Sequence, residues 1–451
     1  MKKSTMWVAI ALMMATVMTT GCTKDSNEAD PLLVIDPVEP TDPTDPNNDE
    51  PLVPPENNEL KPIRLTRAEQ ELVNSNNDFA FRLFRQINTA NPSGPCFEPP
   101  KSQIVSPISI TYALGMLNNG AAGETQAQIN KVLGFGEAGA DGINAFCQKM
   151  LTEAPNLDQL TKVMIANNIY MNKGYQLLPD FVSKAKLYYN ADVETRDFYD
   201  GQTRDVINKW ASDHTMGMIP EVLKEGEFDQ KAVSYLLNAI YFKGAWAEKF
   251  DKDNTKEEEF ETGYGTEKKL VPMMHQESEF NYTENEFCQA LSLPYGNGAY
   301  SMTILLPKEG KNIYDVLNTL TAETWQRYYQ WMESAIADVK LPRFETDFDV
   351  NLKLIMTALG MPRAFDMNLA EFPYFCDAST YIDLMKQVAK IKLNEEGTEA
   401  AAVTVIGMAE KTSLSPQEPR RVNFHANRPF LYVISEWSTG AIFFIGKYVG
   451  D

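Results

Sequence analysis

Residues 394–412 read Asn-Glu-Glu-Gly-Thr-Glu-Ala-Ala-Ala-Val-Thr-Val-Ile-Gly-Met-Ala-Glu-Lys-Thr, which joins a run of small residues to a run of β-branched ones. The first half contains Gly397 and the alanines at 400–402, so it lacks a bulky side chain that would anchor it. The second half, residues 403–406, is β-branched throughout and suits a pleated sheet. The pattern predicts a segment that can form a strand but whose flanks suit a loop.

Alternation along this stretch predicts which side of such a strand is buried. Thr398 and the even-numbered residues after it, up to Met408, are small or apolar, whereas the charge of Glu399 on the other side must stay in water. Gly397 opens the segment as a hinge, and Lys411 near its end is the type of residue that a trypsin-like protease binds. An ordinary buried strand that runs into a turn explains the local pattern equally well, so the surroundings decide.

Helical and strand patterns are interleaved irregularly along the chain. Residues 66–87 have helical spacing, and residues 237–246 form an apolar strand pattern. We expect a further helix from Asp349 to Gly360 and, at the carboxyl end, two hydrophobic strands at 430–434 and 441–446. Such an order predicts a mixed α+β fold rather than a repeating parallel unit.

The surroundings of the opening stretch resemble the reactive-loop region of serpins. Glu-Glu-Gly-Thr-Glu-Ala-Ala-Ala at 395–402 is followed by Phe-His-Ala-Asn-Arg-Pro-Phe at 424–430, and residues 104–133 and 237–246 are similar to further serpin segments. The resemblance implies an α+β serpin fold with about three β-sheets, eight to nine helices and an exposed reactive-centre loop.

The function implied by this resemblance is protease inhibition. In serpins the loop is offered as bait and cut, and its hinge half then enters a large sheet as a new central strand. The resemblance therefore implies a suicide-type inhibitor that traps the acyl-enzyme of serine proteases, with cysteine proteases as a further class, and that is not itself an enzyme. The alternative is a non-inhibitory serpin-fold surface protein that binds a ligand or partner, which the small hinge residues disfavour. A structural or carbohydrate-binding surface lipoprotein is a more remote alternative.

Particular residues take roles by the same resemblance. The hinge comprises Glu395, Glu396, Gly397, Thr398, Glu399, Ala400, Ala401 and Ala402. Family spacing places the reactive bond between Lys411 and Thr412, with Met408 and Ala409 as the alternative. A buried cluster that controls sheet opening matches Ser106, Ser109, Asn238 and Gln387. Most relatives have His at the last position, and Gln does not titrate, so we expect loop insertion to depend less on pH.

The amino-terminal region has the features of an export signal and a tether. Residues 1–22 contain Lys2-Lys3, a short apolar stretch and Cys22, as in a bacterial lipoprotein signal peptide in which Cys22 is lipidated. Thr19 departs from the usual Leu there, and a plain secretory signal is the alternative. Residues 23–60 hold eight prolines and eleven acidic residues and predict a disordered tether ahead of a serpin domain at 61–451. We expect a lipid-anchored protein on the bacterial outer membrane or cell surface.

The charge of the chain limits its partners. Of the net charge of −21, residues 23–60 carry −10, and an acidic body without a basic stripe disfavours nucleic acid and anionic membranes. We expect a monomer whose partner is a target protease, trypsin-like or of broad range, and which meets the membrane only through its lipid.

Metal, cofactor and catalytic motifs are missing from the sequence. Cys96, Cys147, Cys288 and Cys376 are widely spaced without a Cys-x-x-Cys pair, and the three histidines stand far apart. The sequence has no Gly-x-Ser-x-Gly, His-Glu-x-x-His or phosphate-loop motif. The glycines at 134–139 match a dinucleotide pattern but follow a helix, so their spacing is accidental. We expect no metal, no cofactor and no enzymatic activity.

Overall fold

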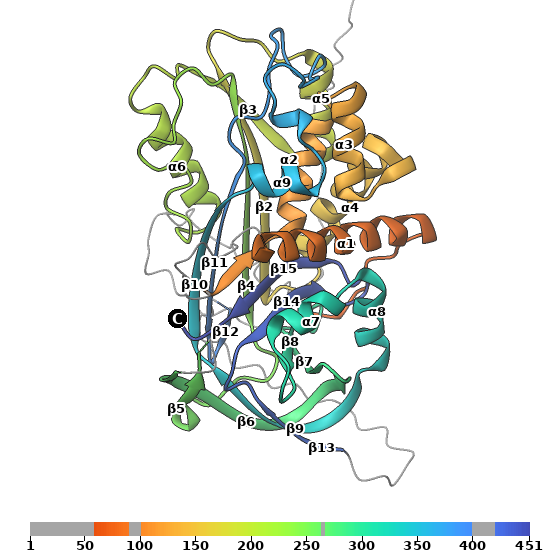
Figure 1. Ribbon diagram of the computed structural model, residues 1–451, viewed down its shortest axis with the longest axis vertical. Coiled ribbons are helices and arrows are strands. Elements are labelled where there is room, and N and C mark those ends of the chain that lie inside the picture. Colours follow the sequence, from red (N-terminus) through yellow and green to blue (C-terminus); the bar gives the residue numbers. More distant parts are fainter. Residues whose placement is uncertain (1–57, 90–100, 263–266, 399–419) are drawn as a thin grey trace, which may run out of the picture. The chain divides into compact units, whose positions relative to one another are not determined.

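Two β-sheets and the helices around them make up the part of the chain that the computed structural model describes, residues 58–89, 101–262, 267–398 and 420–451 (Figure 1). These residues belong to one unit, residues 50–451. The helices of the described part are α1 (Arg67–Thr89), α2 (Pro107–Asn118), α3 (Gly123–Leu133), α4 (Gly139–Glu153), α5 (Pro179–Tyr189), α6 (Thr203–His214), α7 (Ile313–Thr319), α8 (Ala322–Trp331) and α9 (Lys353–Leu359). The predicted mixed α+β fold is confirmed.

The six-stranded sheet contains the hinge. Its strand order is β10 (Phe344–Asn351), β11 (Lys386–Asn394), β12 (Gly397–Thr398), β4 (Ser234–Ala245), β2 (Thr161–Asn172) and β3 (Ala191–Arg196). All neighbouring strands run antiparallel except β2 and β3, which are parallel. The hinge strand β12 therefore lies in the middle of the sheet.

The second sheet contains nine strands. Its order is β1 (Gln103–Val105), β15 (Ile442–Tyr448), β14 (Phe430–Glu436), β8 (Tyr300–Pro307), β7 (Cys288–Tyr295), β6 (Lys268–Glu284), β9 (Glu333–Pro342) and β13 (Arg421–His425), with β5 (Lys256–Glu261) paired to β6. The sequence predicts about three sheets, and the third is the part around β6, β9 and β13. Because the 17-residue strand β6 pairs with both β7 and β9, it joins that part to the rest.

Helices cover the two faces of the six-stranded sheet differently. α2 contacts both β4 and β15 and is buried almost throughout, so it connects the two sheets in the main core. On the opposite face of β4, Tyr235 and Ala239 pack beneath α6 in a second apolar cluster. Phe242, in contrast, packs in the main core against Tyr295 and Phe444. The even-numbered residue Phe242 of β4 therefore faces the main core, and the odd-numbered residues Tyr235 and Ala239 face α6.

The helix predicted from Asp349 to Gly360 is wrong at its start. β10 continues through Asn351 and pairs with β11 along its whole length, and α9 begins only at Lys353. Residues 344–351 alternate between buried and more exposed positions, which suits an edge strand. Pairing with β11 therefore outweighed the helical pattern at residues 349–351. At the other end, Gly360 terminates α9 in a left-handed conformation, as glycine often does after a helix.

Candidate functional site

The structure describes only part of the predicted site. Glu395, Glu396, Gly397 and Thr398 of the hinge and the whole predicted sheet-opening cluster lie in described segments. Outside the described residues lie Glu399, Ala400, Ala401, Ala402, Met408, Ala409, Lys411, Thr412 and Cys22. The site is therefore built from the first half of the hinge and the strands beside it.

β12 is a strand of two residues that bridges two long strands. Thr398 lies opposite Leu393 of β11 and Gly244 of β4, and Gly397 lies opposite Asn394 and Ala245. Beyond these two residues, no described strand lies between β4 and β11. β4 is otherwise paired with β2, and β11 with β10. Each of the two strands therefore presents one long backbone edge toward the other.

Gly397 is required by the close approach of β4. Its φ is +145°, and a Cβ at this position would lie 2.1 Å from the carbonyl oxygen of Gly244. Contact that close is impossible for a side chain, and the conformation itself is one that other residues rarely adopt. Glycine thus lets the chain turn into the sheet at this point.

Thr398 is on the buried side of the sheet, as the alternation predicts. Its side chain is 2% exposed, and its hydroxyl lies 2.6 Å from the hydroxyl of Tyr295. Tyr295 in turn stacks on Trp246, whose indole nitrogen donates to the carbonyl oxygen of Asn394 at 3.0 Å. The hinge is therefore packed against an aromatic pair that also holds the end of β11.

The two glutamates before Gly397 are each held by cations. Glu395 is 2% exposed, forms an ion pair with Arg343, and accepts a hydrogen bond from Thr255 at 2.7 Å. Burial raises the pKa of Glu395, but these partners outweigh it and hold the pKa below its usual value. Glu396 pairs with Lys249 at 2.9 Å and Lys252 at 3.1 Å. These partners come from distant segments, and no sequence signal identified them.

The predicted sheet-opening residues lie together between β11, α2 and β4. The backbone N–H of Ser106 donates to Oε1 of Gln387 at 3.0 Å, and Nε2 of Gln387 donates to the carbonyl oxygen of Ser106 at 2.9 Å. Ser109 hydrogen-bonds to Oδ1 of Asn238, and its backbone N–H contacts the hydroxyl of Ser106. Gln387 thereby satisfies both polar atoms of its amide with one residue.

Two further residues complete this cluster and were not predicted. Ser106 Oγ donates to the carbonyl oxygen of Phe443 at 2.8 Å, which ties the cluster to β15 of the other sheet. Nδ2 of Asn238 donates to Oδ1 of Asn167 on β2 at 2.8 Å. The first is a backbone contact, which the residue type does not reveal, and the second depends on the strand register.

A large cavity lies beside the cluster. Its volume is about 480 Å³, and its lining includes Ser109, Asn238, Gln387, Leu114, Trp210 and Phe375. The indole nitrogen of Trp210 is buried and has no hydrogen-bond partner. The space between β4, β11 and α2 is thus incompletely filled in this form of the protein.

The described residues contain neither a metal-binding cluster nor a helix that could span a membrane. No group of three or more His, Cys, Asp or Glu side chains there has an arrangement that would hold a metal ion. Within the same segments no helix combines the length and apolarity needed to cross a membrane.

Comparisons with known proteins agree with this geometry. The chain is 35% identical over 384 residues to the leukocyte elastase inhibitor of Xenopus tropicalis. The matched region covers 82% of this chain and 97% of that protein. It is 32% identical over 387 residues to Serpin B6 of Macaca fascicularis, and this match covers 84% of this chain and 98% of that protein.

Solved structures with the same fold include a thermophilic serpin and thyroxine-binding globulin. The native state of the thermophilic serpin tengpin matches with a TM-score of 0.74 at 26% identity, over 87% of this chain and 97% of that one. The complex of thyroxine-binding globulin with thyroxine matches with a TM-score of 0.73 at 26% identity. This match covers 84% of this chain and 98% of that one. The family model described as serpin (serine protease inhibitor) matches residues 74–450, and the chain belongs to the serpin family.

Proposed function

We propose that this protein is a suicide-type inhibitor of serine proteases that traps the acyl-enzyme by inserting its cut loop between β4 and β11. The observation that carries the proposal is β12, a two-residue strand that already occupies one end of the space between these strands. A continuous strand there would complete the ladders that β4 and β11 leave open. The relatives named as leukocyte elastase inhibitors support protease inhibition in general.

The register of β12 predicts where an inserted loop would lie. Continued by one residue at a time, it places Ala400 between Phe242 and Ile391, and Ala402 between Ile240 and Ala389. The neighbours at these positions include large side chains, so small residues are needed if the strand is to enter quickly. The same register places Thr404 beside Asn238 and Gln387, at the predicted sheet-opening cluster.

Insertion needs no catalytic group from this chain. The nucleophilic oxygen of the protease attacks the carbonyl carbon of Lys411, the bond to the nitrogen of Thr412 breaks, and the new amine leaves with a proton. The protease is then attached by an ester to the residue at the end of the inserting segment. Movement of that segment pulls the enzyme along the sheet and distorts its active site before water hydrolyses the ester.

The proposed target is a trypsin-like protease. Lys411 would enter a specificity pocket that carries an acidic residue. Cleavage after Met408 would instead suit an enzyme with an apolar pocket. The two candidate bonds are three residues apart along the chain. Both bonds lie in the segment 399–419 that the resemblance assigns to the reactive loop, so inhibition of more than one protease class is consistent with the proposal.

A denaturing gel and mass spectrometry after mixing the protein with trypsin test the proposal. We expect a covalent band near the summed masses and a released fragment that begins at Thr412. A fragment beginning at Ala409 would show that the reactive bond is the alternative one, between Met408 and Ala409. Cleavage by every protease tried, with no covalent band, would show that the protein is not an inhibitor of this type.

A second candidate function is ligand binding without inhibition. The likeness to thyroxine-binding globulin and the cavity of about 480 Å³ support it. The two candidates differ in what loop cleavage does. Insertion raises the thermal midpoint of the cut protein, whereas a carrier that does not insert its loop keeps the midpoint of the intact form.

We further propose that Cys22 carries a lipid and that residues 23–60 hold the body away from a bacterial outer surface. The apolar segment before Cys22 and the Pro/Asp-rich composition after it support this proposal. Metabolic labelling with a fatty acid tests it. Label should enter the wild-type protein and be absent from Cys22→Ser, and label in neither protein would favour a plain secretory signal.

A further inference from the structure

The strand that follows the proposed reactive loop is held at an edge. β13 is the first described element after residues 399–419, and it ends the strand order of the nine-stranded sheet. Its ladder partner is β9, with which it pairs in parallel over five residues. A short edge strand of this kind depends on side-chain contacts more than a central strand does. β13 also anchors the carboxyl end of the loop segment.

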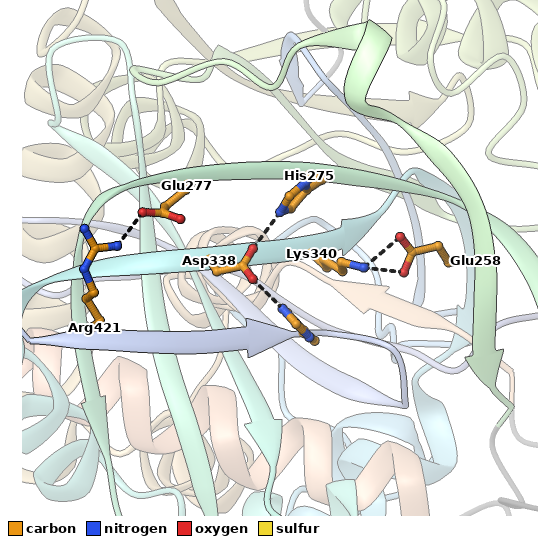
Figure 2. Close-up of polar contacts among 7 residues, drawn as sticks. Glu258, His275, Glu277, Asp338, Lys340 and Arg421 are labelled. Carbon is orange, nitrogen blue, oxygen red and sulfur yellow. Dashed lines mark hydrogen bonds and ion pairs between the residues drawn. The ribbon is translucent and has the colours of Figure 1, made fainter.

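Two histidines from different strands converge on one carboxylate beside β13. Figure 2 shows His275 of β6 beside one carboxylate oxygen of Asp338 of β9. His425 of β13 contacts the other carboxylate oxygen. Nε2 of His275 lies 2.6 Å from Oδ1 of Asp338, and Nε2 of His425 lies 3.1 Å from Oδ2. Between 33% and 42% of each of these side chains is exposed, so protons exchange freely with solvent.

Carboxylates outnumber cations around this trio. Lys340, opposite both histidines in the ladders, is paired with Glu258 of β5 at 2.7 Å. Arg421 of β13 reaches across β9 to Glu277 of β6 at 2.7 Å. With both imidazoles neutral, Lys340 and Arg421 stand against Asp338, Glu258 and Glu277, and Glu279 adds a further carboxylate in the ladder row of Arg421, so the group carries a net negative charge.

We propose that His275, Asp338 and His425 form a pH-sensitive clamp on β13, in which protonation of the histidines tightens the attachment of the strand. A neutral ring donates its Nε2–H to the ionised carboxylate of Asp338. An added proton places a positive charge on the ring as well, so the hydrogen bond becomes an ion pair and is strengthened. Histidine is the side chain whose charge ordinarily changes between about pH 5 and 8, so the clamp responds in that interval.

The direction of the effect follows from the charge balance. Each proton that a histidine gains reduces the net negative charge around Asp338, so protonation is favoured by the neighbouring carboxylates. Burial raises the pKa of Asp338, but its hydrogen bonds to both imidazoles outweigh burial, and the net pKa lies below its usual value. Its contribution is therefore complete above about pH 4 and is lost only in stronger acid. The carboxylate therefore stays ionised throughout the interval in which histidine side chains ordinarily change charge.

The role of the clamp in the loop rests on the proposed function. Before cleavage, a firmly attached β13 fixes the carboxyl end of the loop; after cleavage between Lys411 and Thr412, the inserting segment is no longer connected to β13. The clamp therefore acts on the uncut protein and leaves the trapping step unaffected. Attachment of β13 itself does not depend on inhibition and is measured separately.

Hydrogen exchange of the intact, uncut protein at pH 5.5, 6.5 and 7.5 tests the clamp, with rates corrected for the intrinsic pH dependence of exchange. We expect the protection of a peptide that covers residues 421–425 to be about two- to fivefold greater at pH 5.5 than at pH 7.5, as suits a partly exposed ion pair. His425→Gln, which keeps a hydrogen-bond donor but does not titrate, should abolish most of this difference, and His275→Gln should reduce it.

His214→Gln is the matched control, because His214 lies on α6 and contacts the carbonyl oxygen of Trp210. It should keep the wild-type profile of β13. Equal protection of β13 at all three pH values, lower protection in acid, or an unchanged profile in His425→Gln would overturn the clamp. A normal clamp in a protein that never traps a protease would instead overturn the proposed function alone.

Discussion

At the scale of single residues, Gly397 and Thr398 fix how the chain enters the sheet. The first provides space against the carbonyl oxygen of Gly244, and the second provides a buried hydroxyl that meets Tyr295. The charged pair before them, Glu395 and Glu396, is held by Arg343 and by two lysines. Four consecutive residues therefore each make a different contact, and together they place the start of the loop in register with both neighbouring strands.

Replacement of Gly397 by alanine should release β12 from the sheet. The new Cβ would lie 2.1 Å from the carbonyl oxygen of Gly244, so the strand or its neighbour must move. We expect the thermal midpoint of the uncut protein to fall by about 2–5 °C, as for a loss of one to a few kcal/mol. Gly174→Ala is the control, since a Cβ there meets nothing within 4 Å. Equal midpoints in the two variants would show that β12 does not need glycine.

At the scale of elements, the sequence predicts what depends on local pattern. The buried side of β12, the strand at 237–246 and the two strands at the carboxyl end follow from alternation and apolar runs. The start of α9 does not, because β10 is defined by its pairing with β11. The meeting of His275 and His425 at Asp338 is also invisible in the sequence, since it needs the register of three strands. Contacts between distant segments are therefore what the structure adds.

In the proposed mechanism, we expect Gln387 to uncouple loop insertion from the titration of a histidine. Its amide forms two hydrogen bonds with Ser106 at a position where most relatives are expected to have His, and an amide stays uncharged at every pH. We expect the rate of protease trapping to be nearly flat between pH 5.5 and 7.5 once the profile of the protease itself is removed.

Gln387→His should introduce a pH dependence into trapping, while His425→Gln should leave the flat wild-type profile unchanged. The comparison is informative because positions 387 and 425 lie in different sheets. A histidine at position 387 is expected to affect loop insertion, whereas His425 is expected to affect the attachment of β13. A steep wild-type profile would contradict the role given to Gln387.

At the scale of the whole molecule, the uncut form is expected to be less stable than the cut form. β4 and β11 leave a long edge of each strand without a described ladder partner, and a cavity of about 480 Å³ lies beside them. An inserted strand supplies both the missing backbone partners and side chains that fill part of this space. The proposed mechanism therefore requires the uncut fold to hold free energy that cleavage releases.

Thermal denaturation before and after loop cleavage measures this stored free energy. We expect the midpoint of the cut wild-type protein to rise by well over 10 °C, since several kcal/mol become available in one step. Thr398→Arg should be cut at the same bond without such a rise, because an arginine at this 2%-exposed position would bury its charge against Tyr295. The same variant should release active protease rather than hold it in a covalent band, since insertion is the step that traps. Thr398→Ser keeps the hydroxyl and should behave as the wild type in both measurements. If Thr398→Arg still trapped protease and gained stability on cleavage, the loop would not enter the sheet through the register that β12 defines.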